Sequence, residues 1–70
     1  MQPVVETTST HVNILSVNNI LTRLKKLPQV LFTTMHQEKD GSITVKAYQK
    51  LLPIGVNNIG HNSKIVYLNN

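Results

Sequence analysis

The chain has 70 residues, of which 40% are hydrophobic and none is cysteine, and it carries a formal net charge of +4. This length accommodates one domain at most, and the absence of cysteine excludes a disulfide framework and a thiolate metal site. A chain this short buries only about 60% of its unfolded surface, so we do not expect a self-sufficient enzyme.

The first residues show no pattern typical of a packed element. Residues 1–12 contain Pro3 and a run of Thr and Ser without a helical period, which predicts a flexible leader. We expect residues 13–70 to form a single small α+β domain. The leader lacks the features of a secretory signal, and no apolar run approaches the ~18 residues of a transmembrane helix, so we expect a soluble protein in the cytoplasm.

An amphipathic helix is predicted over residues 14–27. Asn13 can cap its start and Pro28 marks its end, with lysines in the last turn where they suit the helix dipole. Because the apolar stripe is long for so small a core, part of it is a candidate surface for a second copy of the chain or a larger protein partner. That candidate surface consists of Ile14, Val17, Leu21 and Leu24.

The middle of the chain leaves two interpretations open. Residues 28–36 are rich in β-branched and aromatic side chains, which favours a strand, but their apolar positions also fit a helical stripe. Asp40-Gly41 then predicts a turn. After it we expect a short strand over 42–44, a helix over 45–52 that Pro53 ends, and a closing strand over 64–68.

These elements together predict an apolar core. Its expected members are Val17, Ile20, Leu21, Leu24, Leu27, Leu31, Phe32, Ile43, Val45, Tyr48, Leu51, Leu52, Ile65 and Tyr67.

The predicted order of helix, strand, helix, loop and strand resembles part of a winged-helix domain. The similarity is carried by residues 41–52, GSITVKAYQKLL, which look like the strand that leads into the second helix of that fold. Residues 54–62 depart from the family, because they contain Gly55 and Gly60 and no basic residue where a recognition helix should stand. The resemblance implies a loosely winged-helix-like α+β fold that binds DNA.

The positive charge indicates a polyanionic partner, for which nucleic acid is the favoured class. The resemblance to a winged-helix domain implies that the lysines neutralise phosphates, whereas the asparagines pair with base edges. The alternative, that these side chains are simply solvated, stays open. The candidate nucleic-acid-binding residues are Arg23, Lys26, Lys46, Lys50, Asn57, Asn58, His61, Asn62 and Lys64.

Residues 36–48 also resemble a degenerate EF-hand loop. Gly41 falls at the sixth position of that loop, and Glu38 and Asp40 fall at two of its ligand positions. Ala47 replaces the bidentate glutamate at the last position, so calcium binding is not expected. The resemblance implies a metal-free helix–loop–helix that contacts another protein.

Catalytic chemistry has no recognisable motif in the sequence. The three histidines lack zinc spacing, and there is neither a nucleophile elbow nor a phosphate-binding glycine loop. We therefore expect no catalytic residue, no metal and no cofactor. The favoured function is a small basic regulatory or accessory protein that binds nucleic acid, with DNA as the first choice. The alternative is a protein-binding adaptor or inhibitor that acts through the 14–27 stripe.

Overall fold

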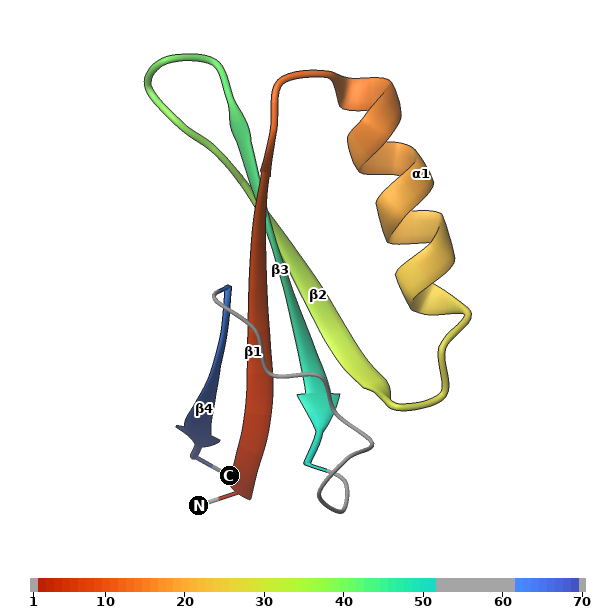
Figure 1. Cartoon of the computed structure of the whole chain (residues 1–70), viewed down its shortest axis with the longest axis vertical. Coiled ribbons are helices and arrows are strands. Elements are labelled where there is room, and N and C mark those ends of the chain that lie inside the picture. Colours follow the sequence, from red (N-terminus) through yellow and green to blue (C-terminus); the bar gives the residue numbers. More distant parts are fainter. Residues whose placement is uncertain (1, 52–61, 70) are drawn as a thin grey trace.

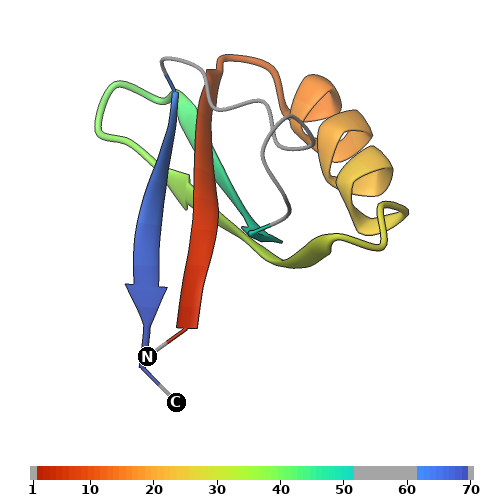
Figure 2. The same ribbon diagram turned by 60° about the horizontal axis from the view of Figure 1, so that its bottom comes forward.

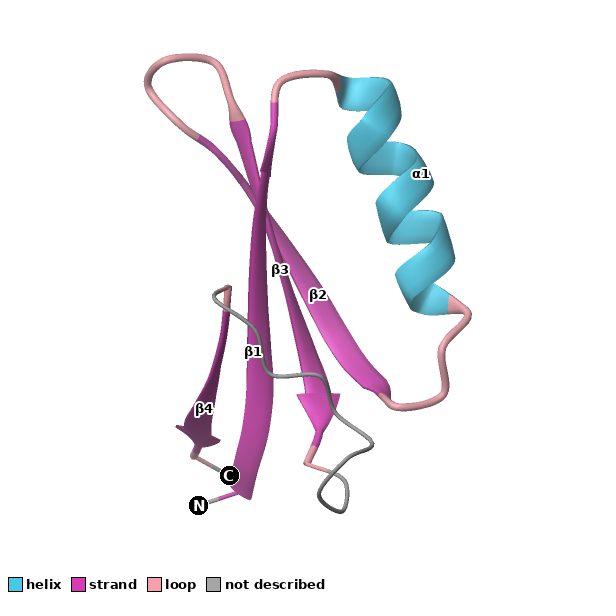
Figure 3. Ribbon diagram, viewed as in Figure 1, coloured by secondary structure: helices cyan, strands magenta, loops and turns pink. Residues whose placement is uncertain are grey.

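The computed structural model describes residues 2–51 and 62–69, which form a four-stranded antiparallel sheet with one helix against it (Figure 1). Along the chain the elements are β1 (Gln2–His11), α1 (Ile14–Lys25), β2 (Val30–Gln37), β3 (Ile43–Lys50) and β4 (Ser63–Leu68). Their order in the sheet is β2-β3-β1-β4, so β1 pairs with both β3 and β4, while β2 and β4 form the edges. Figure 2 shows the twist of this sheet, and Figure 3 shows that α1 lies on one side of it.

The predicted amphipathic helix is confirmed as α1. The side chain of Asn13 accepts a hydrogen bond from the backbone N–H of Leu15 at 2.8 Å, which caps the first turn. Arg23 and Lys25 occupy the last turn, where positive charge interacts favourably with the helix dipole. The helix ends at Lys25, one short connection before Pro28.

The core lies between α1 and the sheet. Val17 is fully buried and packs with Ile43 and Val45 of β3, and Leu21 and Leu24 cover this cluster. The buried apolar residues of the whole described structure are small, namely Val4, Val5, Val17, Ile43, Val45 and Ala47.

The predicted core is therefore only partly correct. Val17, Ile43 and Val45 are buried as expected. Several large side chains that we expected inside are substantially exposed instead: Leu27, Leu31, Phe32, Leu51, Ile65 and Tyr67. Leu52 lies outside the described residues.

The structure differs from the expectation of a flexible leader over residues 1–12. Residues 2–11 form β1, the longest strand, at an interior position of the sheet. Val4 and Val5 are buried there, and the following threonines are β-branched residues that suit a strand.

The prediction of a second helix over 45–52 is wrong, and with it the winged-helix-like α+β fold. Residues 45–50 of this segment belong to β3, in which Ile43, Val45 and Ala47 alternate toward α1 while Tyr48 projects to the opposite face. The period of two took precedence over the helical spacing because β1 and β2 pair with β3 on both sides. The strand predicted over 64–68 is confirmed as β4.

Residues 28–36, which allowed two interpretations, contain the first part of β2 and are not helical. The EF-hand-like helix–loop–helix is therefore also wrong, because β2 and β3 form a hairpin. Its turn at Asp40-Gly41 is confirmed, and Gly41 adopts a φ of +91°, which a residue without a Cβ takes at little cost.

Candidate nucleic-acid interface

The face of the sheet opposite α1, which we call the open face, is covered by no described element (Figure 2). Lys46 is aligned with Thr8 of β1 and Thr34 of β2, so these side chains project to the same side. The same register places Tyr48 beside Glu6 and Phe32. The polar and aromatic side chains that the described strands place on the open face are Gln2, Glu6, Thr8, Thr10, Phe32, Thr34, His36, Thr44, Lys46, Tyr48, Lys50 and Lys64.

Three of the predicted nucleic-acid-binding lysines share this face. Lys46 and Lys50 are four residues apart on β3, and Lys64 of β4 is aligned with Glu6 of the intervening strand β1. The structure separates Arg23 and Lys26 from them, because these two belong to α1 and its C-cap on the other side of the sheet. The predicted residues Asn57, Asn58 and His61 lie outside the described residues.

Glu6 links the strands of the open face. Its Oε2 accepts a hydrogen bond from Tyr48 Oη at 2.9 Å, and its Oε1 lies 3.8 Å from Lys64 Nζ. Burial raises the pKa of Tyr48, and the hydrogen bond to Glu6 and its negative charge raise it further. Only 8% of Glu6 is exposed, but 70% of the Lys64 side chain is, so the Lys64 ammonium remains accessible to an anion.

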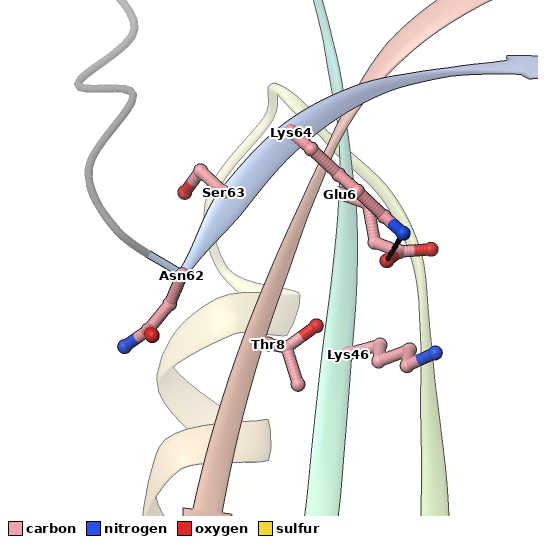
Figure 4. Close-up of a pocket in the computed structure, with 6 residues that line it drawn as sticks. All are labelled: Glu6, Thr8, Lys46, Asn62, Ser63 and Lys64. Atoms are coloured by element: carbon pink, nitrogen blue, oxygen red, sulfur yellow. Dashed lines mark ion pairs between the residues drawn. The ribbon is translucent and has the colours of Figure 1, made fainter.

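A shallow depression of about 370 Å³ lies beside this ion pair. Figure 4 shows the ammonium groups of Lys46 and Lys64 on the same side of the depression as the Glu6 carboxylate. The side chain of Asn62 points the other way, so the structure does not place it with the lysines. The lining residues are Glu6, Thr8, Lys46, Asn62, Ser63 and Lys64.

A second depression of about 230 Å³ lies on the other side of Lys46. Lys46 lines both depressions, and its ammonium group forms no ion pair with any residue that the structure describes. Lys46 is therefore the central accessible cation of the open face. The second depression is lined by Thr34, His36, Glu38, Thr44, Lys46 and Tyr48.

An aromatic pair lies next to the lysines. The rings of Phe32 and Tyr48 stack with centroids 4.6 Å apart and an interplanar angle of 21°. Phe32 is 44% exposed, so part of its ring is open to solvent. Sequence reasoning assigned both rings to the core. A period of two across residues 46–50 would have placed Tyr48 on one face with Lys46 and Lys50.

The predicted partner-binding stripe on α1 is mostly used inside the chain. Val17 is buried, and Leu21 and Leu24 pack against the core cluster. Ile14 alone among the four stripe residues is exposed, at 52%. The helix face therefore serves as the cover of the sheet.

In the part of the chain that the structure describes, no group of three or more metal-ligating side chains lies together, and no helix is long and apolar enough to cross a membrane. Comparison with known proteins found no matching family model, no matching curated protein and no matching solved structure. Function is therefore inferred from the open face alone.

Proposed function

We propose that this chain is a non-catalytic protein that binds single-stranded nucleic acid through its open face. The observation that carries the proposal is that Lys46, Lys50 and Lys64 project from one sheet face that no described element covers, beside the partly exposed Phe32 ring. A regulatory or accessory role inside the cell, where nucleic acid is accessible, belongs to the same proposal.

The chemistry of the open face matches both parts of a nucleotide. Lysine ammonium groups neutralise phosphates, and aromatic rings offer a surface on which bases stack whatever their sequence. Proteins that bind single strands on a sheet use this combination, because the unpaired bases can lie flat on the strands. Threonine hydroxyls on the same face, from Thr8, Thr34 and Thr44, add hydrogen-bonding groups beside the lysines.

The shape of the open face favours a single strand over a duplex. The major groove of B-DNA is about 12 Å wide and admits a helix or a two-stranded ribbon. Four strands at a spacing of about 4.8 Å form a broader surface that does not enter it. The helix α1 is narrow enough to enter that groove, but it carries none of the three open-face lysines.

Fluorescence anisotropy with labelled oligonucleotides of about 12 nucleotides tests the proposal. We expect binding to single-stranded DNA or RNA and weaker binding to a duplex of the same sequence. Contacts from the three lysines predict that log K falls with log salt concentration with a slope of about −2, at roughly −0.7 per phosphate contact on a single strand. Tighter binding to the duplex, or no binding at about 50 mM salt, would contradict the proposal.

A matched pair of variants assigns the binding to the open face. Lys46→Gln removes the central cation of the open face, whereas Lys25→Gln removes the same charge from the last turn of α1. We expect Lys46→Gln to weaken binding and to reduce the salt slope by about 0.7, and Lys25→Gln to have a smaller effect. Equal effects of the two variants would show that overall charge, and not this surface, attracts the nucleic acid.

A further inference from the structure

The second half of the free edge of β2 lacks the features that keep sheet edges from pairing. Natural edge strands are protected by charged residues, proline or short length. β2 has eight residues, VLFTTMHQ, with no Lys, Arg, Asp, Glu or Pro among them. The opposite edge, β4, has six residues and includes Lys64. Three large apolar side chains of β2, Leu31, Phe32 and Met35, are each more than a third exposed.

The hairpin hydrogen bonds show which backbone groups of β2 point outward. The N–H of Glu38 donates to the carbonyl of Ser42 at 2.8 Å, so Glu38 is directed toward β3. In an antiparallel ladder the backbone groups of successive residues alternate between the two sides of the strand. Thr33, Met35 and Gln37 therefore direct their N–H and C=O groups away from β3, to the free edge.

We propose that β2 pairs antiparallel with β2 of a second copy of the chain, about a two-fold axis at Met35. Such an axis is perpendicular to the sheet, and residues opposite each other must project to the same face, so the central residue pairs with itself. Met35 can pair with Met35 of the second copy because its backbone N–H and C=O groups point outward, to the free edge. The same register pairs Thr33 with Gln37 of the second copy, whose backbone groups also point outward, so the edge is complementary to itself.

The position of α1 leaves this part of the edge accessible. Figure 1 shows the end of α1 beside the start of β2, whereas the end of β2 that leads into the β2–β3 turn lies away from the helix. The depression between α1 and β2 is lined by Lys25 and by residues 30–33, which also places the helix at the start of the strand. The irregularity in the β2–β3 register lies between Val30 and Phe32, so the segment that would pair is regular.

The charge distribution favours a second copy at β2 and disfavours it at β4. The chain carries a net charge of +4, so two copies repel each other unless they meet at an uncharged surface. Residues 30–37 provide that surface. Pairing of two β4 strands would bring Lys64 of both copies close together, which is unfavourable. The core of the described structure consists of valines, one isoleucine and one alanine, so the chain also gains folding stability from the apolar area that the second copy covers.

Sedimentation equilibrium over a range of protein concentrations, without nucleic acid, tests this dimer directly. We expect the wild-type chain to reach twice its single-chain mass as the concentration rises. Met35→Lys places two like charges at the axis and should raise the dissociation constant by at least about tenfold. A wild-type chain that stays monomeric at all concentrations would overturn the proposal.

Ile65→Lys is the matched control on the other edge. The N–H of Thr8 donates to the carbonyl of Asn62 at 2.9 Å, so alternation directs the backbone of Ile65 outward from β4, as that of Met35 is directed from β2. The two side chains have similar exposure, 45% for Ile65 and 55% for Met35. Ile65→Lys should leave the dimer intact. Loss of the dimer in Ile65→Lys, with or without loss in Met35→Lys, would refute an interface between two β2 strands.

Amide hydrogen exchange tests the same β2–β2 interface without any substitution. The amides of Thr33, Met35 and Gln37 face solvent in the single chain and are hydrogen-bonded in the proposed dimer. Their exchange should slow by about tenfold or more as the dimer forms. Fast exchange of all three in a sample with the dimer mass would place the interface elsewhere. Because these measurements involve no oligonucleotide, their outcome is separate from that of the proposed function.

Discussion

Tyr48 Oη of β3 donates a hydrogen bond to Glu6 Oε2 of β1 at 2.9 Å, across two neighbouring strands of the open face. The second oxygen of the same carboxylate lies 3.8 Å from Lys64 Nζ of β4. One nearly buried carboxylate therefore connects three strands, and it also places a negative charge beside the lysines of the open face.

The first prediction concerns the titration of Tyr48. Its pKa is raised by burial, by the hydrogen bond to Glu6 and by the Glu6 charge, so the folded state favours the protonated phenol. The resulting stabilisation is complete below the unfolded pKa of 10.0 and is lost as the pH rises through the higher folded pKa. We therefore expect the free energy of unfolding, measured in urea, to fall as the pH increases above about 10.

Glu6→Gln provides the control for this titration. The substitution removes the charge of Glu6 and leaves burial in place, so the pKa of Tyr48 should fall part of the way toward 10.0. Tyrosinate absorbance reports the titration when it is followed in a Tyr67→Phe background, which leaves Tyr48 as the only tyrosine. An unchanged Tyr48 titration in Glu6→Gln would show that Glu6 does not act on this phenol.

The second prediction is that Glu6→Gln strengthens nucleic-acid binding. Removal of the carboxylate charge releases Lys64 from its ion pair and makes the open face more positive. For a partly exposed pair we expect an affinity gain of about two- to fivefold in the anisotropy assay. Tyr48→Phe removes the hydrogen bond but keeps the charge, so it should give no gain. Weaker binding by Glu6→Gln would contradict the proposed role of the open face.

The third prediction concerns the β2–β3 turn. Gly41 has a φ of +91°, and a Cβ added there would meet no heavy atom within 4 Å. The cost of Gly41→Ala is therefore that of the backbone conformation alone, about 1–2 kcal/mol of unfolding free energy. Gly41→Asn should cost less, because asparagine tolerates positive φ better than alanine does. Equal losses in thermal unfolding of the two variants would contradict this explanation.

The elements that local sequence determines were predicted correctly. The helix α1 has its cap at Asn13 and its apolar period within its own residues, and the Asp40-Gly41 turn depends on a single dipeptide. β1 was missed because the burial of Val4 and Val5 depends on pairing with residues 43–50 and 63–68, which no local pattern of residues 1–12 reveals.

The candidate site shows the same division between local and distant information. The positive charge and the winged-helix resemblance predicted that Lys46, Lys50 and Lys64 contact phosphates, but a helix over 45–52 would have arranged them differently. Residues 43–50 carry both a helical and a two-residue period, and only the pairing with β1 and β2 decides between them. Because residues 43–50 form a strand, Tyr48 lies on the same face as the lysines, and Phe32 of β2 is part of the same surface.

The last prediction tests how much the small core depends on Val17. This side chain is fully buried between α1 and β3, against Ile43 and Val45. Val17→Ala removes its two methyl groups from the centre of the cluster and should lower the free energy of unfolding by about 2 kcal/mol. Val12→Ala makes the same chemical change at a site that is 90% exposed and should have no measurable effect. Urea unfolding of both variants at one fixed protein concentration gives the comparison, because the proposed dimer would make stability depend on concentration. Equal effects of the two substitutions would show that α1 does not pack on the sheet through Val17.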